Sequence, residues 1–352
     1  MKILKLLLIL SVVEINLIAL SGRAGEATPP VVIDEAPARL QGVEPRFWSA
    51  SFSPDGKSLA VTGGWETPEE PGQLVIWDVG SRSQKLVLRQ EKTIRSAVFS
   101  PDGTLLALCD FAGNTKILDS STGRMNAILP PHPKLVNSVA FTADGKTLIA
   151  GSFDGRITVW DVAAGKEQHT FSLPDDMVVT VAVSSDGRHL GAVTWQGKAH
   201  LWDLPSRQKT HELTVNKGLP NTIGIAEAIT FAPDGKTFVT GCWDTRVTIW
   251  DTVSGRTIRE LTGHTSSVQN AAYSPSGTVL ASSDAQGTVL LWDPATGDRI
   301  STLHAHANRC FGLAFSRDGK YLATAGWDRS AKIWETETWK PVTTLTRERS
   351  AK

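Results

Sequence analysis

The sequence predicts an all-β protein, a seven-bladed β-propeller of four-stranded antiparallel sheets, from two repeated features. Self-similarity at a fixed period, here about 42 residues, is the mark of a repeat architecture. The first feature is a Ser-Pro-Asp-Gly-like phrase that begins at Ser53, Ser100, Thr142, Ser184, Ala232, Ser274 and Ser316. The second is an apolar run that ends at Trp77-Asp78, Leu118-Asp119, Trp160-Asp161, Trp202-Asp203, Trp250-Asp251, Trp292-Asp293 and Trp334-Glu335.

Each repeat divides into four expected strands, as the third repeat illustrates. Its segments are LVNSVAF (135–141), KTLIAGS (146–152), RITVWDV (156–162) and KEQHTFSL (166–173). An Asp-Gly turn between alternating runs is a strong hairpin signal, and β-branched residues favour the third segment as a strand. Seven such units close into a ring with few exposed edges. An open solenoid would need polar terminal caps, which neither end repeat resembles.

Closure of the ring has two candidates. Residues 340–345 trail the last repeat, and residues 38–41 precede the first, yet only one segment can form the outer strand of blade seven. Pairing within the last repeat costs less closure entropy, which favours 340–345. The expected organisation is therefore a propeller over residues 40–346, a linker over 22–39 and a C-terminal tail over 347–352.

The N-terminus has the layout of a secretory signal that ends at residue 21, or as late as 25. Lys2 and Lys5 precede an apolar stretch over 6–13, and small residues follow within 19–22. Glu14 interrupts the segment, and a carboxylate at mid-membrane costs about 2.5–3.5 kcal/mol on insertion scales. We therefore expect export to the periplasm or medium without a stable membrane span. The alternative is an uncleaved N-terminal membrane anchor.

Composition excludes several classes of function. The 36 basic residues balance the 36 acidic ones, so the chain lacks the basic excess that supports nucleic-acid binding. Cys109, Cys242 and Cys310 are far apart, which indicates neither a disulfide framework nor a zinc site. We expect no metal and no cofactor.

No catalytic motif emerges from the sequence. Three Gly-Lys-Thr/Ser fragments, such as Gly235-Lys236-Thr237, lack the preceding glycine of a phosphate-binding loop and lie in hairpins. The expected inner strands are small and apolar, so we expect a non-enzymatic protein. Two alternatives stay open: an enzyme or small-ligand binder at the channel mouth, and a passive structural subunit of a larger assembly.

The repeats resemble the WD-repeat (tryptophan–aspartate) family over about residues 40–346. This resemblance implies a hydrogen-bonded tetrad of His, acid, Ser or Thr, and Trp in each complete blade. Blade three has Ala150 in the hydroxyl place, and blade six has Gln286 in the place of the acid. The tetrad residues that match are His132, Asp154, Trp160, Asp244, Trp250, His264, Trp292, His306, Thr324, Asp328 and Trp334.

Two insertions mark one face of the ring. In the first repeat 22 residues separate Asp55 from Trp77, against 16 in the others, because of extra residues around 65–72. In the fifth, 32 residues separate Trp202 from Asp234, against 25 or 26 elsewhere. These second-to-third and fourth-to-first connections emerge on the same side of a four-stranded blade. Added loop length costs little stability, so its accumulation there points to function.

The resemblance also implies partner contacts on that face, at three positions in each blade. We expect a monomeric propeller that binds a protein or peptide there, through Arg46, Trp48, Trp65, Arg95, Phe111, Asn137, Phe153, Trp195, Glu227, Trp243, Gln269, Arg309, Phe311 and Trp327. Trp65 requires a one-residue bulge, since the unbroken register places Gly64 there. Trp243 has two interpretations, filler between blades or an exposed contact.

Overall fold

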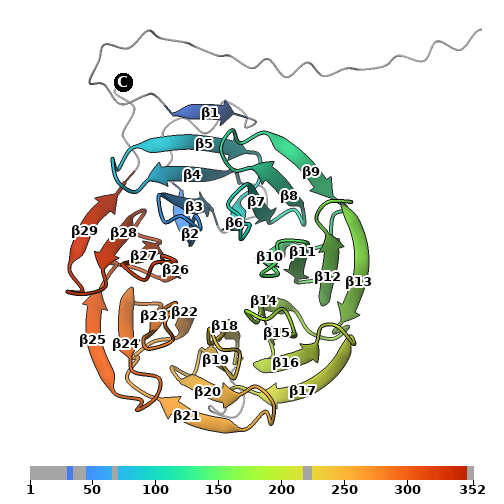
Figure 1. Cartoon of the computed structure of the whole chain (residues 1–352), viewed down its shortest axis with the longest axis vertical. Coiled ribbons are helices and arrows are strands. Elements are labelled where there is room, and N and C mark those ends of the chain that lie inside the picture. Colours follow the sequence, from blue (N-terminus) through green and yellow to red (C-terminus); the bar gives the residue numbers. More distant parts are fainter. Residues whose placement is uncertain (1–29, 35–44, 66–69, 217–223, 347–352) are drawn as a thin grey trace, which may run out of the picture.

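The computed structural model describes residues 30–34, 45–65, 70–216 and 224–346, and within them seven sheets surround one axis (Figure 1). The predicted all-β seven-bladed propeller is confirmed. The expected signal segment, the tail, and most of both insertions lie outside the described residues.

Each blade runs from the centre of the ring outward in sequence order, apart from an added outer strand in blade one (Figure 1). Blade one consists of β1 (Val31–Asp34), β2 (Arg46–Phe52), β3 (Ser58–Gly64), β4 (Gly72–Asp78) and β5 (Gln84–Gln90). Blade two consists of β6 (Ile94–Phe99), β7 (Leu105–Asp110), β8 (Thr115–Asp119) and β9 (Met125–Leu129). Blade three consists of β10 (Val136–Phe141), β11 (Thr147–Ser152), β12 (Arg156–Asp161) and β13 (Lys166–Ser172). Blade four consists of β14 (Val178–Val183), β15 (His189–Thr194), β16 (Lys198–Asp203) and β17 (Gln208–Thr214), and blade five of β18 (Ala226–Phe231), β19 (Thr237–Cys242), β20 (Val247–Asp251) and β21 (Thr257–Leu261). Blade six consists of β22 (Val268–Tyr273), β23 (Leu280–Asp284), β24 (Thr288–Trp292) and β25 (Arg299–His304). Blade seven consists of β26 (Cys310–Phe315), β27 (Tyr321–Gly326), β28 (Ala331–Glu335) and β29 (Pro341–Leu345).

The Ser-Pro-Asp-Gly turns join the first and second strands and satisfy their own polar groups. In blade one the Ser53 hydroxyl donates to Asp55 at 2.6 Å, and the backbone N–H of Lys57 donates to the same carboxylate at 3.0 Å. Gly56 adopts φ 70°, a conformation that glycine accepts without strain. The Ser53 hydroxyl, with the Lys57 N–H, lowers the pKa of Asp55. The repeated aspartate is therefore a turn residue.

The core lies between neighbouring blades. The tryptophans of the closing pairs all lie on third strands and are buried. Trp334 of blade seven, for example, packs in one cluster with Leu291 of blade six. Each tryptophan thus fills the space that opens between sheets as they spread from the axis.

The C-terminal segment forms the outer strand of blade seven, as predicted. β29 pairs with β28 in an antiparallel register, and every strand of blade seven comes from one continuous stretch of chain. The competing segment, 38–41, lies outside the described residues. Blades seven and one consequently share no strand in the described chain and meet through side chains, including Phe47, Trp77, Ile333 and Leu345.

The interpretation of residues 22–39 as a linker is wrong at 31–34. These residues form β1, which pairs in parallel with β5 and gives blade one a fifth strand. Ile33 explains the attachment, because it packs against the core of blades one and two. A Cβ atom at position 123 would lie only 2.7 Å from the Cδ1 methyl group of Ile33. A residue larger than Gly123 would therefore obstruct the Ile33 side chain.

Candidate protein-interaction face

The candidate face is the end of the ring where second strands turn into third strands and successive blades are linked, called here the insertion face. One backbone hydrogen bond orders it in each of blades two to seven. In blade five the N–H of Trp243 donates to the carbonyl of Ile225 at 3.0 Å, and in blade seven Trp327 donates to Arg309 at 2.9 Å. This bond sets the residue before each turn beside the start of the innermost strand.

The innermost strands also carry a β-bulge at the same place in all seven blades. The register shift falls at Trp48, Arg95, Asn137, Val179, Glu227, Gln269 and Phe311. A bulge redirects the side chain of the extra residue and is common beside functional sites. Six of these seven residues belong to the face expected from the sequence, and the bulge is the local feature that sets their direction.

The expected extra bulge that would place Trp65 in the repeat position is wrong. Gly64 pairs with Arg46 with no shift beyond the one at Trp48 that all blades share, so Gly64 holds the place that Trp327 holds in blade seven. A Cβ at Gly64 would lie 2.4 Å from the Thr93 hydroxyl oxygen, which leaves no room for a larger residue. Trp65 follows one residue later and is half-buried, and its backbone N–H donates to the Thr93 hydroxyl at 2.8 Å.

One group of predicted residues gathers where blade seven meets blades one and two. The Trp48 ring lies 5.0 Å from Trp327, 5.1 Å from Phe311 and 5.7 Å from Phe111, between ring centroids. Three guanidinium groups accompany these rings: those of Arg46, Arg95 and Arg309. We call these seven residues the arginine–aromatic cluster.

A second group, the aromatic arc, runs over blades three to five. Phe153 lies 5.7 Å from Trp195, and Trp195 lies 6.4 Å from Trp243, between ring centroids. Phe153 and Trp195 are half-buried, whereas Trp243 is 37% exposed. The indole N–H of Trp243 donates to Glu227 at 3.1 Å, which fixes the exposed ring. Ala285 holds the equivalent place in blade six, so the arc ends at blade five.

Two further predicted polar residues, Asn137 and Gln269, lie on inner strands. Asn137 is buried, accepts a hydrogen bond from Arg95 at 2.8 Å and donates to the carbonyl of Val179 at 2.6 Å. Gln269 is also buried and donates to Ser267 at 3.1 Å. These contacts stay within the protein, so both residues position the face.

Glu227 is the acid that faces the arginines from blade five. Burial raises the pKa of its carboxyl group, and this effect outweighs the opposing charge of Arg95, the Trp243 hydrogen bond and the charge of Arg309. Burial likewise lowers the pKa of Arg95, against the attraction of Glu227. The two side chains therefore interact across the inner strands of blades two and five.

The tetrad of blade seven contains the four residues expected from the sequence. His306 is 2.8 Å from the Thr324 hydroxyl and 2.9 Å from the Asp328 carboxylate, and Trp334 donates to Thr324 at 3.1 Å. Burial by itself would raise the pKa of Asp328, but the hydrogen bond and charge of His306 lower it to about 2. In blade five, Trp250 donates to Thr240 at 2.8 Å, and Asp244 pairs with Arg246 at 3.1 Å.

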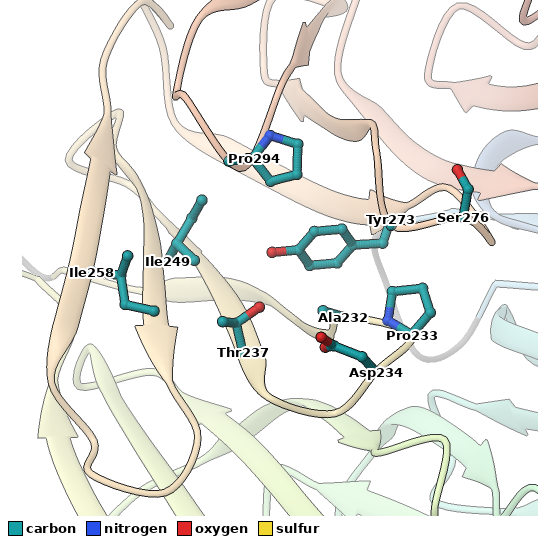
Figure 2. A pocket seen from close by; sticks show the side chains of 11 residues that line it. Ala232, Pro233, Asp234, Thr237, Ile249, Ile258, Tyr273, Ser276 and Pro294 are labelled. Atoms are coloured by element: carbon teal, nitrogen blue, oxygen red, sulfur yellow. The ribbon is translucent and has the colours of Figure 1, made fainter.

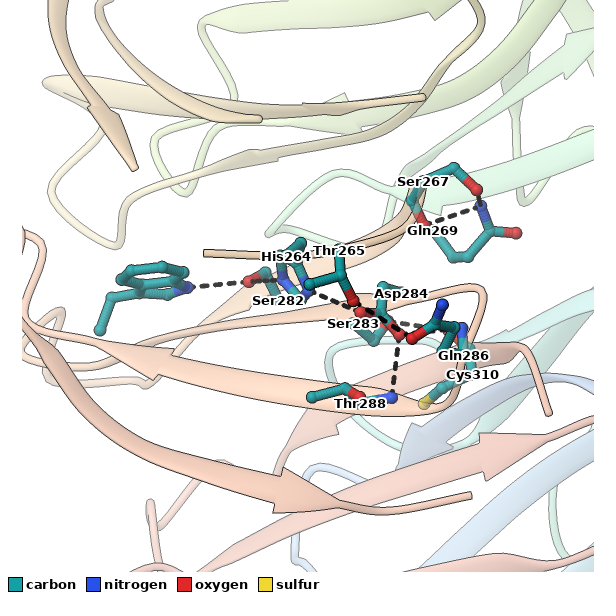
Figure 3. Close-up of polar contacts among 11 residues, drawn as sticks. His264, Thr265, Ser267, Gln269, Ser282, Ser283, Asp284, Gln286, Thr288 and Cys310 are labelled. Atoms are coloured by element: carbon teal, nitrogen blue, oxygen red, sulfur yellow. Dashed lines mark hydrogen bonds and ion pairs between the residues drawn. The ribbon is translucent and has the colours of Figure 1, made fainter. Parts of the chain in front are cut away.

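In blades six and three the tetrad contains a residue other than the one that the sequence alignment predicts. In blade six the acid is Asp284, 3.0 Å from His264, so the network is complete without Gln286 (Figure 3). Ser282 supplies the hydroxyl at 2.7 Å from His264 and accepts from Trp292 at 2.8 Å.

In blade three the missing hydroxyl of Ala150 is replaced from the third strand. Thr158 lies 3.1 Å from His132, whose other ring nitrogen is 3.0 Å from Asp154. The Trp160 N–H makes no hydrogen bond within the described residues. In blade six the acid lies two residues earlier in the chain, and in blade three the hydroxyl comes from the neighbouring strand, while the histidine keeps its place in both.

The opposite face carries cavities between blades. One cavity, with a volume of about 580 Å³, lies between blades five and six, where Tyr273 points toward Thr237 and Ile249 (Figure 2). Another of about 410 Å³ occupies the same repeat position between blades seven and one. Proline and aliphatic side chains make up much of the first lining, including Pro233, Pro294 and Ile258.

The cysteines are unsuited to thiolate chemistry. Burial raises the pKa of Cys109, and it raises the pKa values of Cys242 and Cys310 to about 12. Over the described ranges, no group of three or more His, Cys, Asp or Glu residues is placed to hold a metal ion.

Comparison with known families agrees with the geometry. A model of the WD domain, G-beta repeat (WD40), matches residues 123–161, 222–251, 255–293 and 297–335. None of the curated proteins compared with the chain matches it. The part of the chain that the structure describes contains no apolar helix long enough to span a bilayer. Proteins with this repeat commonly serve as non-enzymatic scaffolds for protein interactions. The four matched repeats and the seven-bladed ring are together consistent with the WD-repeat β-propeller family.

Proposed function

We propose that the protein binds a protein or peptide partner on its insertion face, and that the aromatic arc is the first point of contact. The observation that carries this proposal is Trp243, a large exposed ring held in one orientation by Glu227. Tryptophan and arginine are the residues most enriched where interfaces concentrate their binding energy. A ring that is already fixed loses little conformational entropy on binding.

Trp243→Ala tests this function, with Trp339→Ala as the matched control. Trp339 is half-buried and lies on the turn between β28 and β29, at the opposite face. We expect Trp243→Ala to weaken partner capture by about 2 kcal/mol, roughly thirty-fold, with little change in melting temperature. Capture from an extract of the producing cells, quantified against wild type, provides the measurement. Equal loss in both variants would contradict a specific role for this face.

We propose in addition that the protein is exported and that its partner lies outside the cytoplasm. The signal-like segment is the support, together with β1, which begins at Val31, after the expected cleavage region at 22–25. N-terminal sequencing of native protein should then find a start in that region. Recovery of an intact Met1 from the cytoplasmic fraction would contradict export and leave the binding proposal to be tested inside the cell.

A further inference from the structure

The arginine–aromatic cluster contains many hydrogen-bond donors and few acceptors. Arg309 lies 5.1 Å from the ring centroid of Trp327, and Arg46 lies 4.6 Å from the same centroid, so two cations share one indole. The indole N–H groups of Trp48 and Trp327 are buried and make no hydrogen bond with any described residue. Aromatic faces attract cations but provide no hydrogen-bond acceptor in the plane of a guanidinium group.

Among the described residues, Arg95 and Arg309 meet little negative charge. Arg95 donates to the neutral Asn137 at 2.8 Å and to the Trp48 carbonyl at 3.5 Å. Among the described residues, neither Arg95 nor Arg309 forms an ion pair within 4.0 Å of a carboxylate. The Glu227 carboxylate interacts with the charges of Arg95 and Arg309 without a direct contact. Burial raises the pKa of this carboxyl group and so disfavours its charged form. Half-buried cations without a close counter-ion are electrostatically costly.

The same geometry disfavours a cationic ligand. The Arg95 guanidinium lies 4.7 Å from the centroid of Trp48 and 5.0 Å from that of Phe311, so the chain's own arginine covers both rings. A lysine or arginine of a partner would meet like charge at ring faces that are already occupied. A carboxylate would meet opposite charge and planar donors that match its two oxygens.

We propose that the arginine–aromatic cluster binds the carboxylate side chains of an acidic peptide segment, with Arg309 as the receiving group and Arg95 as the positioning residue. The inference rests on the proposed function and adds the chemistry of the partner. Arg95 is held by Asn137, whereas Arg309 directly precedes β26 and is half-buried beside Trp327. Trp243, on the far side of the ring axis, would contact an apolar side chain of the same segment.

Fluorescence anisotropy with a labelled peptide in which glutamates alternate with leucines tests this proposal on the intact propeller. Counterparts of equal length carry glutamine, lysine or phosphoserine in place of glutamate. We expect the glutamate peptide to bind most tightly, and its affinity to fall as the NaCl concentration rises. Equal binding of the glutamine peptide, or tighter binding of the lysine or phosphoserine peptide, would overturn the carboxylate assignment.

Arg309→Gln locates the site, with Arg124→Gln as a control that removes the same charge from an exposed turn on the opposite face. We expect Arg309→Gln to weaken the glutamate peptide roughly tenfold, the size of one charge-assisted hydrogen bond, and Arg124→Gln to leave it unchanged. Equal effects of the two variants would contradict the site. If Arg309→Gln does not fold, the four peptides on wild-type protein still decide the proposal.

The two proposals fail in different ways. A partner that is captured through Trp243, combined with no binding of the glutamate peptide, would overturn the acidic ligand and leave the interaction face intact. Glutamate-peptide binding that is lost in Arg309→Gln, combined with normal partner capture by Trp243→Ala, would support the acidic site and contradict the aromatic arc as a contact.

Discussion

Trp327 and Trp243 occupy the same position of the repeat and differ in their surroundings. Trp327 lies at the junction of blades seven and one, within 5.3 Å of Phe311 and 5.0 Å of Trp48 between ring centroids. Trp327 itself is half-buried, and its neighbours Trp48 and Phe311 are each only 6% exposed. Within the described part of the chain Trp243 has one aromatic neighbour, Trp195, whose ring centroid is 6.4 Å away, and Trp243 is 37% exposed. One sequence position therefore supplies filler in one blade and accessible surface in another.

Ring closure explains the difference. Blades seven and one are the two ends of the propeller, and no described strand crosses between them. Their contact depends on side chains, so large rings at this junction stabilise the closed ring. Blades four and five follow one another in the chain and do not depend on such a contact for closure. There a tryptophan is free to project outward.

The largest expected effect is on stability at the junction. Trp48→Ala removes a buried ring that touches Phe111, Phe311 and Trp327. Removing a buried tryptophan leaves a cavity and typically costs about 3–5 kcal/mol. Denaturant unfolding of the variant should show this loss, whereas Trp195→Ala in the half-buried arc should lose clearly less. Equal losses would remove the distinction between the two regions.

A smaller effect, dependent on pH, is expected at Asp328, the residue after Trp327. Its folded pKa of about 2 lies below the ordinary 3.8, so its pairing with His306 stabilises the fold above the ordinary pKa. A shift of this size corresponds to about 2 kcal/mol. This stability should disappear between about pH 4 and pH 2. Asp328→Asn should be less stable than wild type at pH 6 and should converge with it near pH 2, as measured by thermal melting. A constant difference across that range would contradict the pairing as the cause.

The smallest expected effect concerns Glu227, which supports Trp243 in the arc. Its folded pKa is raised by burial, so its ionised form opposes folding as the pH rises above the ordinary value of 4.5. Glu227→Gln keeps an acceptor for the Trp243 N–H and removes the buried charge. The variant should be slightly more stable than wild type at pH 7 and equal to it below about pH 4. Lower stability at pH 7 would show that the attraction to Arg95 and Arg309 outweighs burial.

The sequence predicts the fold well because its repeats are regular, and less well where a contact depends on a neighbouring blade. The phrase beginning at Ser53 and the closing pair at Trp77 fix strand order and blade number. Residues 31–34 are too short a run to distinguish a strand from a linker. Their pairing with β5 depends on the space beside Gly123 in the next blade.

The repeat register predicts the positions of most residues of the candidate face, and it fails where contacts with neighbouring segments decide the geometry. The pattern of the other blades favours the large ring of Trp65 over Gly64, and the clash between a Cβ at Gly64 and Thr93 is visible only in the structure. The alignment places Gln286 in the position of the acid, whereas the strand brings Asp284, two residues earlier, to His264. The bulges at positions such as Arg95 leave no mark in one sequence, yet they set the direction of the inner-strand residues of the face.

The most direct test of the account compares Trp243→Ala with Trp327→Ala, with melting temperature and partner capture measured on the same samples. The account predicts that Trp243→Ala loses about 2 kcal/mol of binding and keeps its melting temperature, whereas Trp327→Ala loses about 3 kcal/mol of stability. If both variants melt early and still capture the partner as wild type does, both tryptophans are filler and the insertion face is not the binding surface.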